Sequence, residues 1–147
     1  MSGYKTLTII KPGAVSNEHI GPILAKINSA GFHIAAMKFF RLTRSQAENF
    51  YSIHQEKEFF SSLIDFMTSG PVVVAILEKE NAVAEYRKLI GATDPKKAEE
   101  GTIRKMFAES IERNAVHGSD SDSNAEYECD FFFAKSERFS VFDNCCQ

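Results

Sequence analysis

The chain of 147 residues has the length of one globular domain, and its hydrophobic fraction of 44% is enough to build a core. Together with a charged fraction of 25%, this composition excludes an intrinsically disordered chain. The formal net charge of −3 argues against a protein that holds nucleic acid by bulk electrostatics. A small net charge does not exclude a local cluster of cations in a pocket.

No segment approaches the ~20 apolar residues that a membrane-spanning helix needs, and the first residues show no signal-peptide pattern. The three cysteines, Cys129, Cys145 and Cys146, fit neither a disulfide framework nor a zinc site, and the last two are expected to be exposed thiols. These features predict a soluble, cytoplasmic chain. We expect one domain over residues 1–147, with a short tail after about residue 139.

The first half of the chain alternates between strand and helix signals. Residues 4–10 are short and β-branched and precede Lys-Pro-Gly, which predicts a strand that ends in a loop. Apolar residues at helical spacing over 20–27 predict a helix that Gly31 ends, and a second strand is expected over 33–41. The pair Thr43 and Gln46 resembles a capping box that starts a short helix.

The second half continues the alternation. An amphipathic helix is expected over 59–67, and the apolar run 72–77, which shows no alternation, predicts a strand covered on both faces. Asn81 is expected to cap a helix over 82–89. The remaining expected elements are a polar loop over 91–101, a short strand over 114–117, a helix after Ser121, and a last apolar strand or sheet edge over 131–133. This order predicts an α/β sandwich with helices over a sheet.

Among the four histidines, His117 is the strongest candidate for chemistry. Imidazole titrates near neutrality and serves as a nucleophile, an acid or a base. His19 and His33 lie beside or inside expected secondary structure, which favours structural roles. His117 is followed by Gly118, which lets the backbone bend or a ligand approach. A turn histidine without function remains the alternative.

Three cations and a hydroxyl are candidates for a phosphate site. Lys11 ends the first expected strand, Arg87 lies on a helix, Thr93 lies in the polar loop and Arg104 follows it. Planar guanidinium groups suit phosphate oxygens, and a hydroxyl adds a donor. The alternative for each cation is a solvated surface charge, and spacing in sequence does not show that they converge on His117.

The segment Asn114–Ser121 resembles the active-site signature of the nucleoside diphosphate kinase family, in its bacterial form. Six further blocks agree with the family and follow its order. They are Ile10–Val15, Phe50–His54, Phe59–Phe60, Ser69–Val72, Leu89–Pro95 and Gly101–Arg104. The resemblance covers roughly residues 4–134, and so many blocks in order are not a chance match.

This resemblance implies a ferredoxin-like fold, with a four-stranded antiparallel sheet covered by helices, assembled as a homo-oligomer of four or six copies. It implies transfer of the γ-phosphate of a nucleoside triphosphate, with ATP as donor, to a nucleoside diphosphate by a ping-pong mechanism. This reaction supplies CTP, GTP and UTP. Mg²⁺ is the implied cofactor and is expected to reach the protein through the nucleotide phosphates, with Asp120 as the nearest candidate for a water-mediated contact.

The resemblance also implies roles for residues around the nucleophile. His117 corresponds to the histidine that becomes phosphohistidine. Lys11 and Asn114 correspond to positions that contact the sugar hydroxyls, with Lys11 also near the transferred phosphate. Tyr51 and Glu128 match supporting positions, and Glu128 is expected to hold the imidazole by a hydrogen bond.

Further positions match the nucleotide contacts. Arg87, Thr93 and Arg104 match phosphate-binding residues, and Phe59 matches the ring that stacks on the base. Because every base has a π-face, such stacking implies broad base specificity. The alternatives are that Phe59 belongs to the core and that Glu128 is a solvated helix charge.

Two other functions remain open from the sequence. One is a nucleotide-binding scaffold that has kept the fold and lost turnover. The complete set of candidate residues for the nucleophile and the phosphates argues against it. The other is a nucleic-acid-binding module whose sheet stacks bases on its phenylalanines, which the acidic balance and the lack of an aromatic and basic sheet motif argue against.

Overall fold

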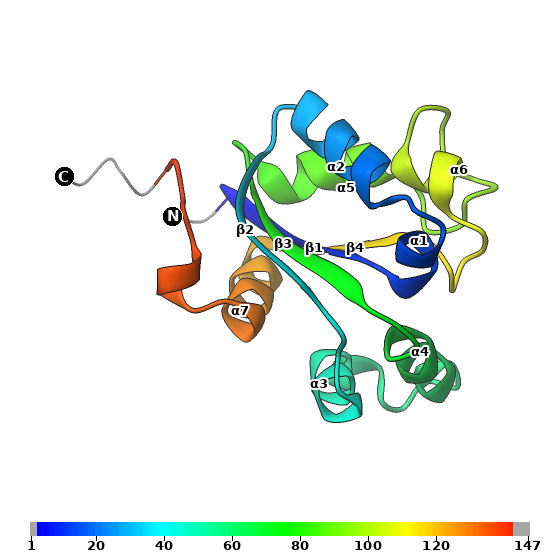
Figure 1. Cartoon of the computed structure of the whole chain (residues 1–147). Coiled ribbons are helices and arrows are strands. Elements are labelled where there is room, and N and C mark those ends of the chain that lie inside the picture. The colour runs from blue at the N-terminus through cyan, green and yellow to red at the C-terminus, as the bar shows by residue number, and fades with distance from the viewer. Residues whose placement is uncertain (1–2, 143–147) are drawn as a thin grey trace.

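The structure is a computed structural model that describes residues 3–142, so that Cys145 and Cys146 lie outside the described range (Figure 1). One four-stranded sheet forms its centre, in the spatial order β2-β3-β1-β4, and every neighbouring pair is antiparallel. The strands are β1 (Lys5–Ile10), β2 (His33–Phe40), β3 (Val72–Glu78) and β4 (Val116–Gly118). This arrangement confirms the expected antiparallel sheet.

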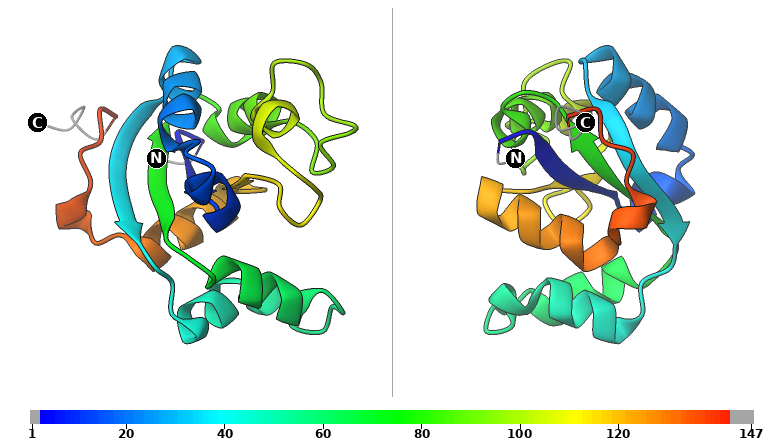
Figure 2. Two further views of the ribbon diagram at one scale, coloured as in Figure 1. Left: turned by 45° about the vertical axis from the view of Figure 1, so that its right-hand side comes forward. Right: turned by 90° about the vertical axis from the view of Figure 1, so that its left-hand side faces the viewer.

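Helices cover both faces of the sheet (Figures 1 and 2). They are α1 (Pro12–Ser16), α2 (Ile20–Ser29), α3 (Arg44–Phe50), α4 (Phe60–Met67), α5 (Ala82–Ile90), α6 (Ile103–Phe107) and α7 (Asp122–Phe132), with the 3₁₀ turns η1 (Ser52–His54) and η2 (Lys135–Glu137). Helices α2 and α5 pack on one face, and α3, α4 and α7 on the other. This is the ferredoxin-like sandwich. Within residues 3–142, none of the helices has the length and apolar character needed to cross a bilayer.

Strand β3 confirms the prediction of a strand covered on both faces, because all seven of its residues are buried. Side chains alternate across a sheet, so the two faces of β3 enter two separate cores. Val72, Val74 and Ile76 pack with α3, α4 and α7, whereas the intervening residues pack with α2 and α5.

Two local signals act as expected. The Thr43 side chain accepts a hydrogen bond from the Gln46 amide (3.1 Å), and the Gln46 side chain accepts one from the Thr43 amide (2.9 Å), which is a complete capping box for α3. Gly31 lies just past the end of α2 with φ +91°, a left-handed conformation that glycine adopts without strain.

The prediction of a strand over 131–133 was wrong. Phe131 and Phe132 form the last turn of α7, whose start is fixed by the Ser121 hydroxyl accepting from the Asn124 amide at 3.1 Å. The rings of both phenylalanines pack against Phe50, so tertiary contact and not sheet pairing accounts for the apolar run.

Other elements differ in smaller ways. Asn81 has φ +57° and makes no side-chain cap to α5, so its expected capping role was wrong. The expected strand 114–117 is observed as Val116–Gly118. Helices α1 and α6, of five residues each, were not predicted. Both are too short to show a helical period, although Thr102 caps α6 by accepting from the Lys105 amide.

The segment after η2 contacts the first half of β2 and then reaches Glu78 at the end of β3. Ala35, where the register between β2 and β3 shifts, accepts a hydrogen bond from the Phe139 amide at 2.7 Å. The buried Glu78 carboxylate accepts from the Val141 amide at 3.0 Å and from the Ser140 hydroxyl. The described part of the C-terminal tail is therefore packed on the sheet.

Gly118 is a position where the sheet leaves no room for a side chain. A Cβ there would lie 3.0 Å from Ile90 Cδ1 and 3.1 Å from Cδ2 of the fully buried Tyr86. We expect Gly118→Ala to lower the free energy of unfolding by about 1–3 kcal/mol, because the Tyr86 ring has no free space into which to move. Urea unfolding measures this change.

The matched control is Gly21→Ala in α2, where a Cβ meets nothing within 4 Å. We expect this variant to be neutral or up to about 1 kcal/mol more stable, because alanine is the better helix former. Equal unfolding midpoints for the two variants would contradict the packing argument.

Candidate active site

A histidine–carboxylate pair lies between the sheet and α7. Antiparallel pairing sets His117 of β4 opposite Ile9 of β1, and the His117 Nε2 lies 2.7 Å from Oε1 of Glu128 on α7. The carboxylate accepts, so Nε2 carries the proton, and in the neutral ring the lone pair is on Nδ1. That atom has no hydrogen-bond partner among the described residues. The pair therefore presents an oriented, nucleophilic nitrogen.

Ser119 holds the carboxylate in place, a role that the sequence analysis missed. Its hydroxyl donates to Glu128 Oε1 at 2.7 Å and accepts from the Leu7 amide at 3.1 Å, and the residue is fully buried. Ser119 belongs to the Asn114–Ser121 segment, so its place in that motif was the available signal.

Two aromatic rings enclose the imidazole. Phe50 and Tyr51 meet His117 edge to face, with centroid distances of 5.3 and 6.5 Å. Burial, with a smaller effect of the Glu128 charge, raises the pKa of the Tyr51 phenol, so it stays protonated. Tyr51 and Glu128 thus both lie beside His117, and Glu128 is not a solvated helix charge.

Lys11 is buried at the junction of β1 and α1. Its backbone amide donates to the Ala115 carbonyl at 2.9 Å, which places it next to the turn before β4. Only 6% of the residue is exposed, and its Nζ has no partner in the described part of the chain. Desolvation, with a smaller effect of the Arg104 charge, lowers the pKa of Lys11 to about 7, while Glu112 acts in the opposite direction.

The turn before β4 is strained. The Val116 amide donates to the Asn114 carbonyl at 2.9 Å across one residue, and that residue, Ala115, has φ +73°. This is a γ-turn in the left-handed region, a rare and costly conformation that clusters at functional sites. Asn114 is buried, and its Oδ1 has no hydrogen-bond partner among the residues described.

Arg104 ties this turn to the polar loop. Its guanidinium donates to three backbone carbonyls, those of Gly91 (3.0 Å), Asn114 (3.3 Å) and Val116 (2.9 Å). Desolvation lowers the pKa of Arg104 to about 10, so it remains charged at neutral pH. A guanidinium has five N–H donors, so two remain for a ligand.

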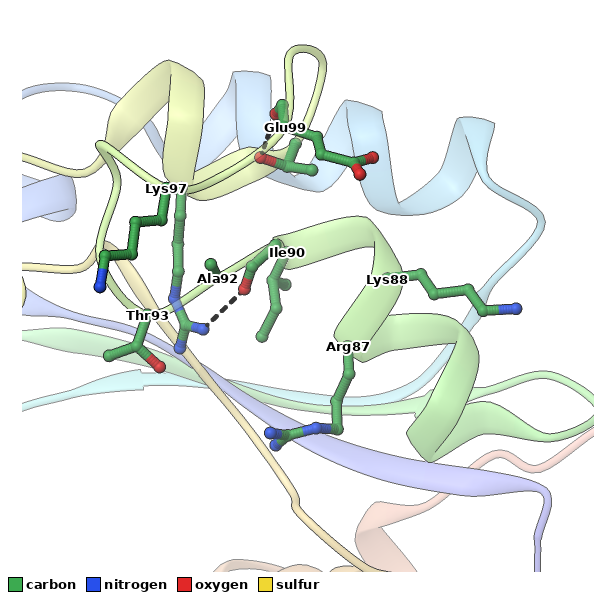
Figure 3. A pocket seen from close by; sticks show the side chains of 10 residues that line it. Arg87, Lys88, Ile90, Ala92, Thr93, Lys97 and Glu99 are labelled. Atoms are coloured by element: carbon green, nitrogen blue, oxygen red, sulfur yellow. Dashed lines mark hydrogen bonds between the residues drawn. The ribbon is translucent and has the colours of Figure 1, made fainter.

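A cationic cavity of about 470 Å³ opens beside Arg104 (Figure 3). Arg87, Thr93 and Arg104 line it, as does Lys97, whereas the Lys88 side chain points away from Thr93 in the figure. Neither Arg87 nor Lys97 pairs with a carboxylate within residues 3–142. The structure therefore brings together the predicted phosphate contacts.

A second cavity, of about 480 Å³, is lined by Lys11, Tyr51, Phe59 and Asn114, and Thr93 lines both cavities. Phe59 is 47% exposed, which excludes its assignment to the core. The remaining lining residues, which the sequence analysis did not assign, are His54, Leu63, Ile111 and Glu112. Phe59 and Ile111 give this cavity an apolar mouth suited to a planar ring. His117 itself lines neither cavity.

Known proteins share both the sequence and the fold. The profile of the nucleoside diphosphate kinase family matches residues 4–138. A nucleoside diphosphate kinase from Campylobacter hominis is 59% identical over 90% of this chain and 97% of the relative. The Aquifex aeolicus nucleoside diphosphate kinase superposes with a TM-score of 0.89, at 42% identity, over 91% of this chain and 97% of that one. A Halobacterium salinarum nucleoside diphosphate kinase, solved in complex with CDP, gives a TM-score of 0.89 at 34% identity, over 92% and 91% of the two chains.

The fold, the oriented imidazole of His117 and the cationic cavity, which Arg104 links to the turn before β4, define a ferredoxin-like phosphotransferase. With a family match over most of its length, the chain belongs to the nucleoside diphosphate kinase family. It is a kinase that acts on nucleotides.

Replacing Glu128 tests how the imidazole is oriented. An amide can donate as well as accept, so Glu128→Gln lets the proton move from Nε2 to Nδ1. We expect kinase turnover to fall on the order of 10²-fold or more, as when a carboxylate that orients a catalytic histidine is replaced by an amide. Nitrogen NMR of His117 reports the tautomer directly.

Glu126→Gln on the same helix is the control, since Glu126 is half-exposed and its ion pair is with Lys5 (3.3 Å) and not with the site. We expect the His117 tautomer and the turnover of this variant to match those of the unmodified chain. A Glu128→Gln variant with unchanged turnover would show that the hydrogen bond to His117 has no catalytic part.

Proposed function

We propose that His117 carries the phosphoryl group between two half-reactions. Its Nδ1 attacks the γ-phosphorus of ATP or another nucleoside triphosphate, the bond to the bridging oxygen breaks, and the nucleoside diphosphate leaves. A second nucleoside diphosphate then attacks the phosphohistidine through a β-phosphate oxygen and releases the imidazole. The observation that supports this proposal is the 2.7 Å contact of Nε2 with Glu128, which leaves the lone pair on Nδ1.

The surrounding charges suit this chemistry. When the N–P bond forms, the imidazole becomes cationic, and the Glu128 carboxylate stabilises that charge. Phosphoryl transfer depends mainly on positioning and on positive charge around the phosphate oxygens. Lys11, Arg87 and Arg104 supply that charge from different elements of the fold.

We further propose the nucleotide contacts. Arg87, Thr93 and Arg104 hold the phosphates, supported by the cationic cavity that they line. Lys11 and Asn114 contact the sugar hydroxyls, and the unpartnered Asn114 Oδ1 is an acceptor for them. Phe59 stacks on the base. The CDP complex of the Halobacterium salinarum relative supports a nucleotide site in this fold.

Mg²⁺ is proposed to arrive on the nucleotide phosphates, whose negative charge it neutralises. Over residues 3–142, no three side chains of His, Cys, Asp or Glu gather as a metal cage. The Asp120 carboxylate, which accepts from Asn124 Nδ2 at 2.5 Å, lies just before α7, whose first turn also carries Asp122. One carboxylate that reaches the ion through water fits a cation that keeps several of its waters and binds substrate phosphates.

We propose that the chain works as one domain over residues 1–147, with a tail after about 139, in the cytoplasm, as a homo-oligomer of four or six copies. The buried free thiol of Cys129 supports a reducing compartment. The edge strand β2 exposes Met37 (52%) and Phe39 (63%), apolar side chains that a second copy would cover.

Labelling with γ-labelled ATP and Mg²⁺, without an acceptor, tests the phosphohistidine. We expect label on the chain that is stable to alkali, lost in acid and discharged by added GDP. The label should be absent from His117→Ala, which removes the nucleophile and little packing, and present in the control His33→Ala. Bound ATP without any label would contradict the proposal and favour a scaffold without turnover.

Light scattering tests the assembly. We expect Phe39→Glu to shift the mass of the complex toward smaller species, because it puts a charge in the apolar contact. The control Ile53→Glu changes an equally apolar residue, 80% exposed, on η1. An unchanged mass for Phe39→Glu would place the contact elsewhere.

A further inference from the structure

Lys11 is a buried amine without a direct partner, and the nearest acidic influence on it comes from Glu112, which lines the same cavity and only partly offsets the effect of burial. Its Nζ makes no hydrogen bond or ion pair in the described chain, although only 6% of the residue is exposed. Lysines in such surroundings almost always have a partner. The pKa of Lys11, lowered by burial to about 7, means that about half of these amines are neutral at pH 7, against about one in 10³ for an ordinary lysine.

The same amine is within reach of a ligand. Lys11 lines the cavity of about 480 Å³, and this cavity meets the cationic one at Thr93. The Arg104 charge is close enough to affect Lys11. A small molecule whose phosphate is held by Thr93 and Arg104 would therefore extend its neighbouring atoms into the cavity that Lys11 lines.

We propose that Lys11 is a site of direct acylation by acyl phosphates, of which acetyl phosphate is the simplest. The inference rests on the proposed phosphate-binding role of Thr93 and Arg104. The neutral Nζ attacks the carbonyl carbon, the bond from that carbon to the phosphate oxygen breaks, and inorganic phosphate leaves. The nitrogen loses a proton to solvent, and the product is an uncharged amide.

Acylation removes one of the cations assigned to the nucleotide. The modified chain loses kinase turnover, and a bound nucleotide protects Lys11 because it occupies the same cavity. The extent of modification then depends on the ratio of nucleotide to acyl phosphate.

Acetyl phosphate offers a competing reaction at phosphorus. There, His117 Nδ1 would take the phosphoryl group and release acetate. The His117→Ala chain removes this route, and peptide mass spectrometry separates an acyl group on Lys11 from a phosphoryl group on His117.

The experiment incubates the His117→Ala chain with acetyl phosphate at neutral pH and follows each lysine by peptide mass spectrometry. The exposed Lys57 is the internal reference. We expect Lys11 to be acetylated at least about tenfold faster than Lys57, because its neutral fraction is so much larger. Saturating ADP should bring the rate at Lys11 down below that of Lys57. In the chain with His117 intact, turnover should fall in proportion to acetylation of Lys11, and Lys11→Arg should leave no acyl group at this position.

Acetylation of Lys11 no faster than that of Lys57, or a rate unchanged by ADP, would overturn the inference. This outcome is distinct from a failure of the proposed phosphohistidine. The phosphohistidine is measured by the γ-label on His117, whereas the inference is measured by the acyl group on Lys11. Selective acetylation without a γ-label leaves the inference standing and overturns the proposed nucleophile.

Discussion

The three hydrogen bonds from Arg104 to backbone carbonyls hold the site together. They join the loop at Gly91, the turn at Asn114 and the strand at Val116, three segments that sheet hydrogen bonds alone do not connect. A buried cation is costly unless its donors are satisfied, and here carbonyl dipoles satisfy three of them without a counter-ion. The positive charge therefore stays without a counter-ion and is available to an anion, which is why we propose that the residue that orders the site also binds the phosphate.

The site carries its cations in an unfavourable state. Lys11 and Arg104 are both desolvated, the Arg104 charge lowers the pKa of Lys11, the Arg87 charge lowers the pKa of Arg104, and Ala115 adds backbone strain beside them. Such strain persists only where the surrounding structure enforces it. A bound polyanion relieves the repulsion among these cations. Because the nucleotide binds the folded chain, it raises the free energy of unfolding.

Much of the fold could be predicted because the deciding interactions are local. The uninterrupted apolar run of β3, the capping box at Thr43 and the residues around His117 all carry their signal within a few positions. The run 131–133 could not be assigned in this way, since three consecutive apolar residues are compatible with a helix as well as with a strand. Ser119, Ile111 and Glu112 escaped notice for another reason: their importance comes from neighbours far away in the chain, such as Leu7 and Phe59.

The segment along β2 has a consequence for unwanted self-association. Exposed strand edges are templates on which other chains polymerise as β-fibres. Here the register of β2 shifts at Ala35, and the Ala35 carbonyl already accepts from the Phe139 amide, so this acceptor is not free to pair with another chain. The C-terminal segment thus makes this edge of the sheet a poorer template for the strands of other chains.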